Sequence, residues 1–148
     1  MTPLAALVRA PIDSLALLRA VSNPGNGAVI LFLGAVRQVN EGRAVTGIDY
    51  AAYEGMALRE LQSIVDEASA RFDTPDVVVE HRLGELEVEE ISVGIAVGHP
   101  HRDAAYGLSR WVIEELKRRV PIWKREHYAD GTREWVDPSG RTSVGSAR

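Results

Sequence analysis

The sequence has 148 residues, a formal net charge of −4 at pH 7 and no cysteine; 45% of its residues are hydrophobic and 26% are charged. These are ordinary proportions for a soluble globular protein, whereas the missing cysteine excludes disulfides, thiolate metal sites, a cysteine nucleophile and a persulfide on this chain. The acidic balance disfavours a general nucleic-acid binder. No apolar run approaches the roughly 20 residues of a membrane helix, and residues 1–10 lack the features of a secretory signal, so we expect a cytoplasmic protein.

The first half of the chain predicts two helices and two strands. Asp13 can cap a short helix, which the turn around Pro24 ends. The nearly continuous apolar run over residues 28–36 is typical of a strand buried on both faces, and a second strand is expected over 45–53. Apolar residues recur at helical spacing over 55–72, which indicates an amphipathic helix.

The second half predicts further strands over 77–83 and 92–98, another around 86–88, and a long helix after Asp103. Pro121 should end that helix near Val120, because proline lacks an amide hydrogen and clashes with the preceding turn. Irregular alternation of helices and strands, with hairpins, indicates the α+β class. We predict one domain over residues 1–138 and a flexible tail over 139–148.

The segment EELKRRVPIWKRE, residues 114–126, is the most informative stretch. It sets Lys117 and Lys124 on either side of the Pro121 corner, with Trp123 beside the second lysine. Ammonium groups that are close together or partly buried lose protons more easily, and such lysines can act as bases or nucleophiles. The alternative is structural: Lys117 on a solvated helix face and Trp123 in the core.

Other cationic residues suggest an anion site. Arg37 directly follows the apolar strand, at the rim of a sheet where ligands commonly bind. His101 and Arg102 precede Asp103, the expected helix cap, and free amides at a helix start attract anions. His99 and His101 form an H-x-H pair, but no third metal ligand is evident, so we predict neither a metal nor a cofactor.

Three segments taken together resemble the catalytic (large) subunit family of molybdopterin synthase: GAVILFLGAVRQVNEG, the His101-Arg102 helix start, and LKRRVPIWKRE. Their order and spacing match from about residue 27 to residue 135, and YEGM at 53–56 and HRLGEL at 81–86 support the match. The resemblance implies an α/β-hammerhead fold with an additional antiparallel β subdomain. It also implies a homodimer in which each copy binds a small ubiquitin-like sulfur-carrier subunit, giving a heterotetramer.

The resemblance further implies a sulfurtransferase. The C-terminal Gly-Gly thiocarboxylate of the small subunit would supply sulfur in two transfers that convert cyclic pyranopterin monophosphate (precursor Z) to molybdopterin. Lys117 and Lys124 would be catalytic, Lys117 next to the thiocarboxylate. Phosphate, pterin or neighbouring contacts would come from the substrate-binding residues Ala35, Val36, Arg37, His101, Arg102, Arg125 and Glu126.

Some positions depart from the pattern of this family. Ala51 stands where an acidic residue is common, Glu89 occupies a turn position that is often glycine, and Tyr106 replaces a usual phenylalanine. Glu89 therefore predicts a different hairpin around residues 88–90. Two alternatives stay open at this point: a non-catalytic pterin- or phosphate-binding module of the same fold, and RNA binding through the segment around Trp123.

Overall fold

A computed structural model describes residues 3–136 of the chain. Its elements in chain order are β1 (Leu4–Val8), α1 (Ser14–Ala20), β2 (Ala28–Ala35), β3 (Val39–Asn40), β4 (Arg43–Ala52), α2 (Glu54–Phe72), β5 (Val77–Arg82), β6 (Gly84–Glu87), β7 (Ile91–His99), α3 (Arg102–Arg119), β8 (Ile122–Tyr128) and β9 (Arg133–Val136). The predicted α+β class is confirmed. The predicted tail over 139–148 lies outside the described residues, and the single-domain boundary stays a prediction.

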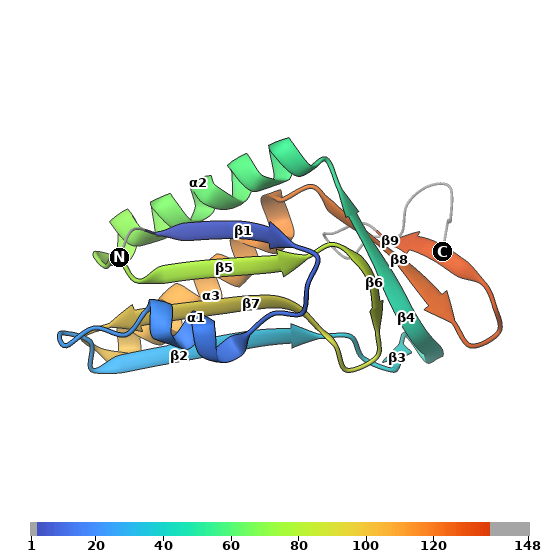
Figure 1. The fold of residues 1–148 in the computed structure, drawn as a ribbon, viewed down its shortest axis with the longest axis horizontal. Helices are drawn as coiled ribbons and strands as arrows, with labels where there is room; N and C mark the ends of the chain where they lie inside the picture. The colour runs from blue at the N-terminus through green and yellow to red at the C-terminus, as the bar shows by residue number, and fades with distance from the viewer. Residues whose placement is uncertain (1–2, 137–148) are drawn as a thin grey trace.

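The main layer is a four-stranded sheet in the order β1-β5-β7-β2. β1 runs parallel to β5, and the other pairs are antiparallel. Figure 1 shows α2 and α3 on one face of this sheet and α1 on the other. The central strands β5 and β7 are almost entirely buried, because helices cover both faces of the sheet.

Local chemistry accounts for where the helices begin and end. The Asp13 carboxylate accepts hydrogen bonds from two backbone amides of α1, as expected for a cap. α3 ends at Arg119, two residues before Pro121, as predicted. The expected start of α3 was wrong: His101 is the residue that precedes the helix, and Asp103 lies within its first turn. An acidic residue there still stabilises the helix, because the amides of the first turn carry partial positive charge.

The prediction that residues 28–36 form a strand buried on both faces was also wrong. β2 pairs only with β7 and forms an edge of the sheet. Val29 is 43% exposed, and Phe32 and Leu33 are each 36% exposed. Apolar composition alone cannot distinguish a central strand from an edge strand with an uncovered apolar surface.

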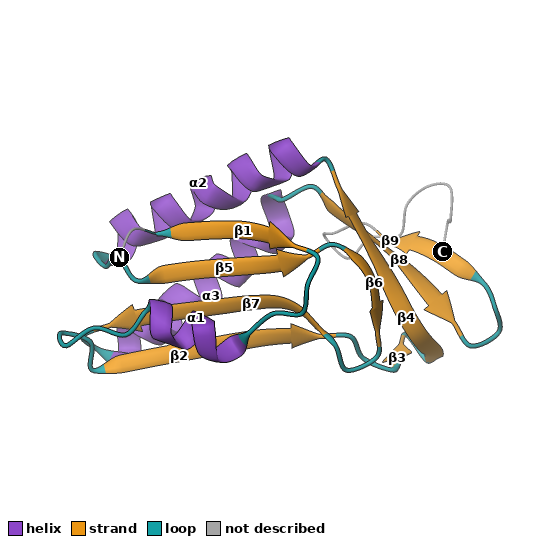
Figure 2. Ribbon diagram, viewed as in Figure 1, coloured by secondary structure: helices purple, strands orange, loops and turns teal. Residues whose placement is uncertain are grey.

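A second sheet lies at one end of the main layer, where Figure 2 shows its strands crossing the direction of the first sheet. Its order is β3-β4-β8-β9, and β6 also pairs with β4. Side chains alternate between the two faces of β8, so Lys124 and Glu126 point to one side, and Arg125 and His127 to the other. Within residues 3–136, no helix is long and apolar enough to cross a membrane.

Candidate functional site

A cavity of about 220 Å³ lies where the two sheets meet the end of α3. The end of β2 and the loop after it form one wall, while β4, β8 and the last turns of α3 form the others. The polar and charged side chains that line it are Arg37, Asn40, Tyr50, Ser92, Lys117, Lys124 and Glu126. Positive charge therefore predominates around a cavity large enough for a small molecule.

Lys117 and Lys124 are the only lysines in the sequence, and both line this cavity. Lys117 comes from α3, one turn before the Pro121 corner, and Lys124 comes from β8 just after it. Lys117 is exposed, and it borders more than one hollow. The surrounding protein nevertheless lowers the pKa of its amine by desolvation, and the positive charge of Lys124 lowers that pKa further.

Glu126 anchors the other side of the cavity. Its side chain is buried, with a residue exposure of 2%. One carboxylate oxygen accepts hydrogen bonds from the Asn40 amide at 2.7 Å and the Tyr128 hydroxyl at 2.6 Å. The other oxygen lies 3.7 Å from the Lys124 amine. A buried carboxylate with two donors on one oxygen is a fixed negative charge, and its ion pair holds Lys124 at the cavity wall.

The same network reaches Arg37. The Arg37 guanidinium donates to the Asn40 side-chain oxygen at 3.2 Å, so Asn40 connects the arginine to Glu126. Burial and the hydrogen bond to Glu126 raise the pKa of Tyr128 to about 12, which keeps its hydroxyl a donor at neutral pH. Arg37, Lys124 and Glu126 are therefore positioned by one another before any ligand binds.

The structure brings most of the predicted site residues together. Those that line the cavity are Ala35, Val36, Arg37, Lys117, Lys124 and Glu126. His101 and Arg102 lie at the opposite end of α3 from Lys117, roughly 23 Å away at the helical rise of 1.5 Å per residue. Within one chain they cannot share a small ligand with Lys117.

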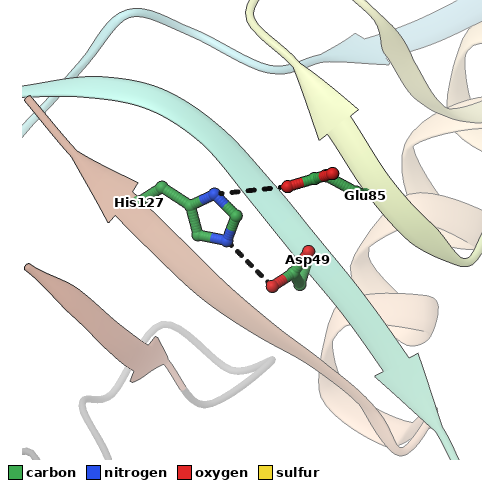
Figure 3. Close-up of side chains that lie close together, drawn as sticks. All are labelled: Asp49, Glu85 and His127. Atoms are coloured by element: carbon green, nitrogen blue, oxygen red, sulfur yellow. Dashed lines mark hydrogen bonds and ion pairs between the residues drawn. The ribbon is translucent and has the colours of Figure 1, made fainter. Parts of the chain in front are cut away.

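Arg125 also does not line this cavity. It points to the other face of the second sheet, where it donates to Asp49 at 2.7 and 3.2 Å. His127 Nε2 donates to the same Asp49 oxygen at 2.8 Å, and Glu85 lies 3.8 Å from the other ring nitrogen (Figure 3). Burial alone would raise the pKa of Asp49, but the bonds from Arg125 and His127 together lower it.

Asp49, Glu85 and His127 are also the residues best placed to hold a metal ion among those described. Two features disfavour that use. The Arg125 guanidinium already occupies Asp49, and a cation beside it would be repelled. The two carboxylates also lie at opposite ring nitrogens of His127, which cannot both bind one ion. We therefore describe this group as a closed ion-pair cluster.

The predicted H-x-H pair is engaged in local structure. One ring nitrogen of His99 lies 3.0 Å from the Phe72 carbonyl oxygen, and the other accepts from the His101 backbone amide at 3.0 Å. Both nitrogens of His99 thus have protein partners. In the described part of the chain, the main cavity is lined by one carboxylate and by no histidine.

Sequence reasoning missed several residues of this site. Three of them line the cavity: Asn40, Tyr50 and Ser92. Tyr128 does not line it but bonds Glu126. These residues are separated along the chain and follow no motif that predicts a shared site. Period-two alternation along residues 122–128 was the signal for part of this set, because it places Lys124, Glu126 and Tyr128 on one face of a strand.

Taken together, the cavity offers two amines, one of them with a lowered pKa, beside an arginine and a fixed carboxylate. A lysine with a lowered pKa gives up its proton more easily than an ordinary lysine, and neighbouring cations stabilise developing negative charge. The site therefore suits proton transfer on an anionic ligand.

Comparison with known proteins agrees with this picture. The family model described as MoaE protein matches residues 7–119. The molybdopterin synthase catalytic subunit of Emericella nidulans is 41% identical over 131 residues, which cover 88% of this chain and 67% of that protein. The crystal structure of molybdopterin synthase from Staphylococcus aureus superposes with a TM-score of 0.79 at 37% identity, covering 87% of this chain and 93% of that one.

A structure from Helicobacter pylori, described as a complex of subunits 1 and 2 of molybdopterin-converting factor, matches with a TM-score of 0.71. The match covers 97% of each chain, but the sequence identity is 22%, so it shows the fold alone.

Proposed function

This chain belongs to the MoaE protein family of molybdopterin synthase catalytic subunits, and we propose that it transfers two sulfur atoms to cyclic pyranopterin monophosphate. It is thus an enzyme of molybdopterin synthesis, a sulfurtransferase. The sulfur donor in this proposal is the thiocarboxylated C-terminus of a small ubiquitin-like subunit. The chain has no cysteine of its own to carry sulfur, so a separate donor is required.

One observation carries the proposal: the only two lysines of the chain line one cavity beside a buried carboxylate. We assign Lys117 to the reacting centre, next to the thiocarboxylate, since its lowered pKa makes proton exchange easier. Lys124, held by Glu126, assists by proton transfer or by stabilising negative charge as the cyclic phosphate opens. A module that only binds phosphate has no need for a lysine whose pKa is lowered, which disfavours the non-catalytic alternative.

Reconstitution tests this function. Pure protein is mixed with the cyclic precursor and the thiocarboxylated small subunit, and dithiolene formation is measured. We expect product only when all three components are present. A protein that binds the precursor but forms no product with the active donor would instead support the binding module.

In this proposal His101 and Arg102 bind the substrate phosphate, so they would act at a site that one chain cannot complete. The uncovered edge of β2 suggests how a homodimer would solve this. Ala28, at the start of β2, pairs with His99, so His101 and Arg102 lie near that end of the strand, while the cavity lies at the other end. Antiparallel pairing of two β2 edges about a two-fold axis would bring the start of one strand to the end of the other.

In this arrangement, the partner's His101 and the partner's Arg102 would approach Arg37 and the cavity. The exposed apolar side chains of β2 and Tyr106 on α3 would be covered at the same time. The two halves of the predicted anion site, separated by the length of α3 within one chain, would then belong to one site. Arg102→Ala should weaken precursor binding by about 1.5–3 kcal/mol, the range for a hydrogen bond to a charged group.

Mixing two impaired variants tests the shared site, at a precursor concentration too low for Arg102→Ala to bind. Lys117→Ala and Arg102→Ala each damage a different half of it. If subunits exchange freely, half of the dimers are mixed and each mixed dimer has one intact site, so roughly a quarter of the activity returns. Sites contained within single chains would give no recovery, and that result would exclude the shared arrangement.

We further propose that each copy binds one small subunit, giving a heterotetramer. A Gly-Gly tail is narrow enough to enter the cavity past the backbone of Ala35 and Val36, because glycine has no side chain to exclude. The Helicobacter pylori complex of two subunits supports such a pairing by analogy. Light scattering should show the heterotetramer, and removing the Gly-Gly tail should weaken it. Persistent separate elution of both proteins at micromolar concentration would contradict this assembly.

The proposed compartment is the cytoplasm, since the relatives compared above are biosynthetic enzymes. Cell fractionation with detection of the native protein tests this placement.

A further inference from the structure

A second, smaller hollow of about 30 Å³ lies beside the main cavity, and Lys117 and Lys124 border both. The other polar side chains around it are Tyr50 and His81, and the remaining lining is apolar. Tyr50 also borders the main cavity, whereas His81 borders only the smaller hollow. None of the functions assigned above uses His81, although it is a titratable group next to both lysines.

The hydrogen bonding of His81 defines its tautomer. The residue is 3% exposed, and its Nδ1 lies 2.8 Å from the carbonyl oxygen of Arg82. A carbonyl oxygen only accepts, so Nδ1 carries the proton and donates it in this bond. Burial lowers the pKa of His81 to about 4, and the positive charge of Lys117 acts in the same direction. The ring is therefore neutral at neutral pH, and Nε2 holds a lone pair.

Within residues 3–136, no donor is hydrogen-bonded to that lone pair; of the two ring nitrogens, only Nδ1 has a partner. The ring packs edge-on against Tyr50, with the centroids 5.1 Å apart and the planes at 74°. This contact restrains the ring, and His81 is one of the residues that line the small hollow. Because Nδ1 is bonded to Arg82, Nε2 is the ring nitrogen that remains to meet a group in that hollow. A hollow of this size admits about one or two water molecules when polar groups are present to hold them.

Donors and acceptors around the small hollow are unequal in number. The two ammonium groups only donate. The Tyr50 hydroxyl is hydrogen-bonded to Ser92, and Lys124 already has Glu126 as its ion-pair partner. No carboxylate of the described residues borders this hollow. Nε2 of His81 is therefore the acceptor best placed for the Lys117 amine.

We propose that His81 is a positioning residue for Lys117. A water in the small hollow accepts a hydrogen bond from the Lys117 ammonium and donates one to Nε2 of His81. This inference rests on the proposed role of Lys117. The bond would hold the lysine between the two hollows and direct its amine toward the main cavity. It would also favour the charged amine, and so limit how far burial lowers the pKa of Lys117.

Two substitutions separate the ring nitrogens. His81→Gln can place an acceptor near the position of Nε2 but loses the bond to the Arg82 carbonyl. His81→Asn can keep a donor near the position of Nδ1 but removes the acceptor at the hollow. If His81 positions Lys117, the Gln variant should retain more turnover, while the Asn variant should retain more thermal stability. A purely structural role predicts that turnover follows stability, and that outcome would overturn the proposal.

Because the chain has only two lysines, NMR of protein labelled with ¹³C at lysine Cε gives two side-chain signals, which Lys117→Arg assigns. In His81→Asn, the pKa of Lys117 should fall by about one unit, a tenfold change in its acid dissociation constant. In His81→Gln it should stay close to the native value. Equal Lys117 titrations in both variants would contradict the hydrogen bond.

Should neither variant fold, ¹⁵N-histidine NMR of the native protein decides the matter. We expect the His81 Nε2 to be unprotonated at neutral pH and its signal to change in Lys117→Met. A protonated Nε2 would overturn the proposal. None of these NMR measurements requires sulfur transfer, so failure of the proposed function and failure of the His81 contact would be seen separately.

Discussion

The two faces of β8 carry ion networks of similar composition and different organisation. On the inner face, Glu126 is bonded by Asn40 and Tyr128 and pairs with Lys124 at the cavity. On the outer face, Asp49 is bonded by Arg125 and His127.

The outer network closes on itself, since each strong donor there has a carboxylate from a neighbouring strand. The inner network does not: Lys117 borders the cavity with no carboxylate partner among the described residues, and Lys124 is 3.7 Å from its own. An ion pair that is satisfied within the protein stabilises the sheet, whereas a lysine directed into a hollow keeps its charge and proton for a ligand. Within one strand, charges on the outer face of β8 therefore stabilise the fold, whereas charges on the inner face are available to a ligand.

The largest expected effect is at Lys117. Lys117→Ala should lower the rate of product formation by about 10²–10⁴-fold, the usual contribution of general acid–base catalysis. Lys117→Arg should not restore it, because a guanidinium stays protonated. Turnover is measured with thiocarboxylated small subunit, and thermal unfolding checks the fold.

Arg118→Ala is the matched control. Arg118 is the next residue on the same helix, is exposed, and pairs with Glu115. Its loss should leave turnover nearly unchanged. Near-native turnover in Lys117→Ala would remove this lysine from the mechanism. The inner face of β8 would then not differ in function from the outer face.

Glu126→Gln should have the next largest effect, on both turnover and stability. The amide cannot hold Lys124 as an ion. When its oxygen keeps the bonds from Asn40 and Tyr128, its nitrogen, a donor, faces the Lys124 amine and has no acceptor there. We expect a loss of about 1–3 kcal/mol in the free energy of unfolding, the cost of an unsatisfied buried group, together with slower product formation. Urea unfolding and turnover give the two values.

Glu134→Gln provides the same chemical change at the position paired with Glu126 in β9, where the partner is Arg43. It should affect turnover much less. Equal loss of turnover in both variants would mean that the effect of Glu126 arises from the sheet and not from the cavity.

The sequence predicted most elements because their patterns are local. Asp13 caps α1, the amphipathic run forms α2, and Pro121 ends α3. The error at β2 has a different origin, since whether an apolar strand is central or at an edge depends on partners distant in the chain. The predicted start of α3 was wrong because both His101 and Asp103 suit the beginning of a helix.

For the site, the motif predicted the lysines and Glu126, and the structure brings them to one cavity. The motif could not predict Asn40 or Tyr128, because their role depends on how β3 and β8 approach each other. It also could not separate Arg125 from its neighbours, although strand alternation places it on the opposite face. The functional roles of all these residues stay predictions.

The outer network should contribute stability that depends on pH. The pKa of Asp49 is lowered in the folded protein, so its contribution is present above the ordinary aspartate pKa and is lost as pH falls through the folded value. Asp49→Asn should lower the free energy of unfolding by about 1–3 kcal/mol at neutral pH. The difference from the native protein should shrink in acid.

Urea unfolding at neutral and acidic pH measures this difference, and turnover is measured in parallel. Turnover should change little, because Asp49 does not line the cavity. A large loss of turnover would indicate that Arg125, released from Asp49, matters to the reaction, which would bring the outer face into the site and weaken the contrast with the inner face.

The smallest expected effect concerns Glu89, in the turn between β6 and β7 beside the cavity. Its φ is +78°, a conformation that favours glycine. The Glu89 amide donates to the Val36 carbonyl at 2.7 Å, and the Val36 amide donates to Glu90 at 3.0 Å, so this turn fixes one wall of the cavity through its backbone. The predicted different hairpin at Glu89 is not required, since the residue adopts the conformation that glycine would favour.

Glu89→Gly should relieve the left-handed strain while adding freedom to the unfolded chain, for a net gain of about 0.5–1 kcal/mol in the free energy of unfolding. Turnover should be unchanged, because both backbone bonds to Val36 remain. Thermal unfolding and turnover test this, and a less stable variant would show that the Glu89 side chain supports the wall by contacts of its own.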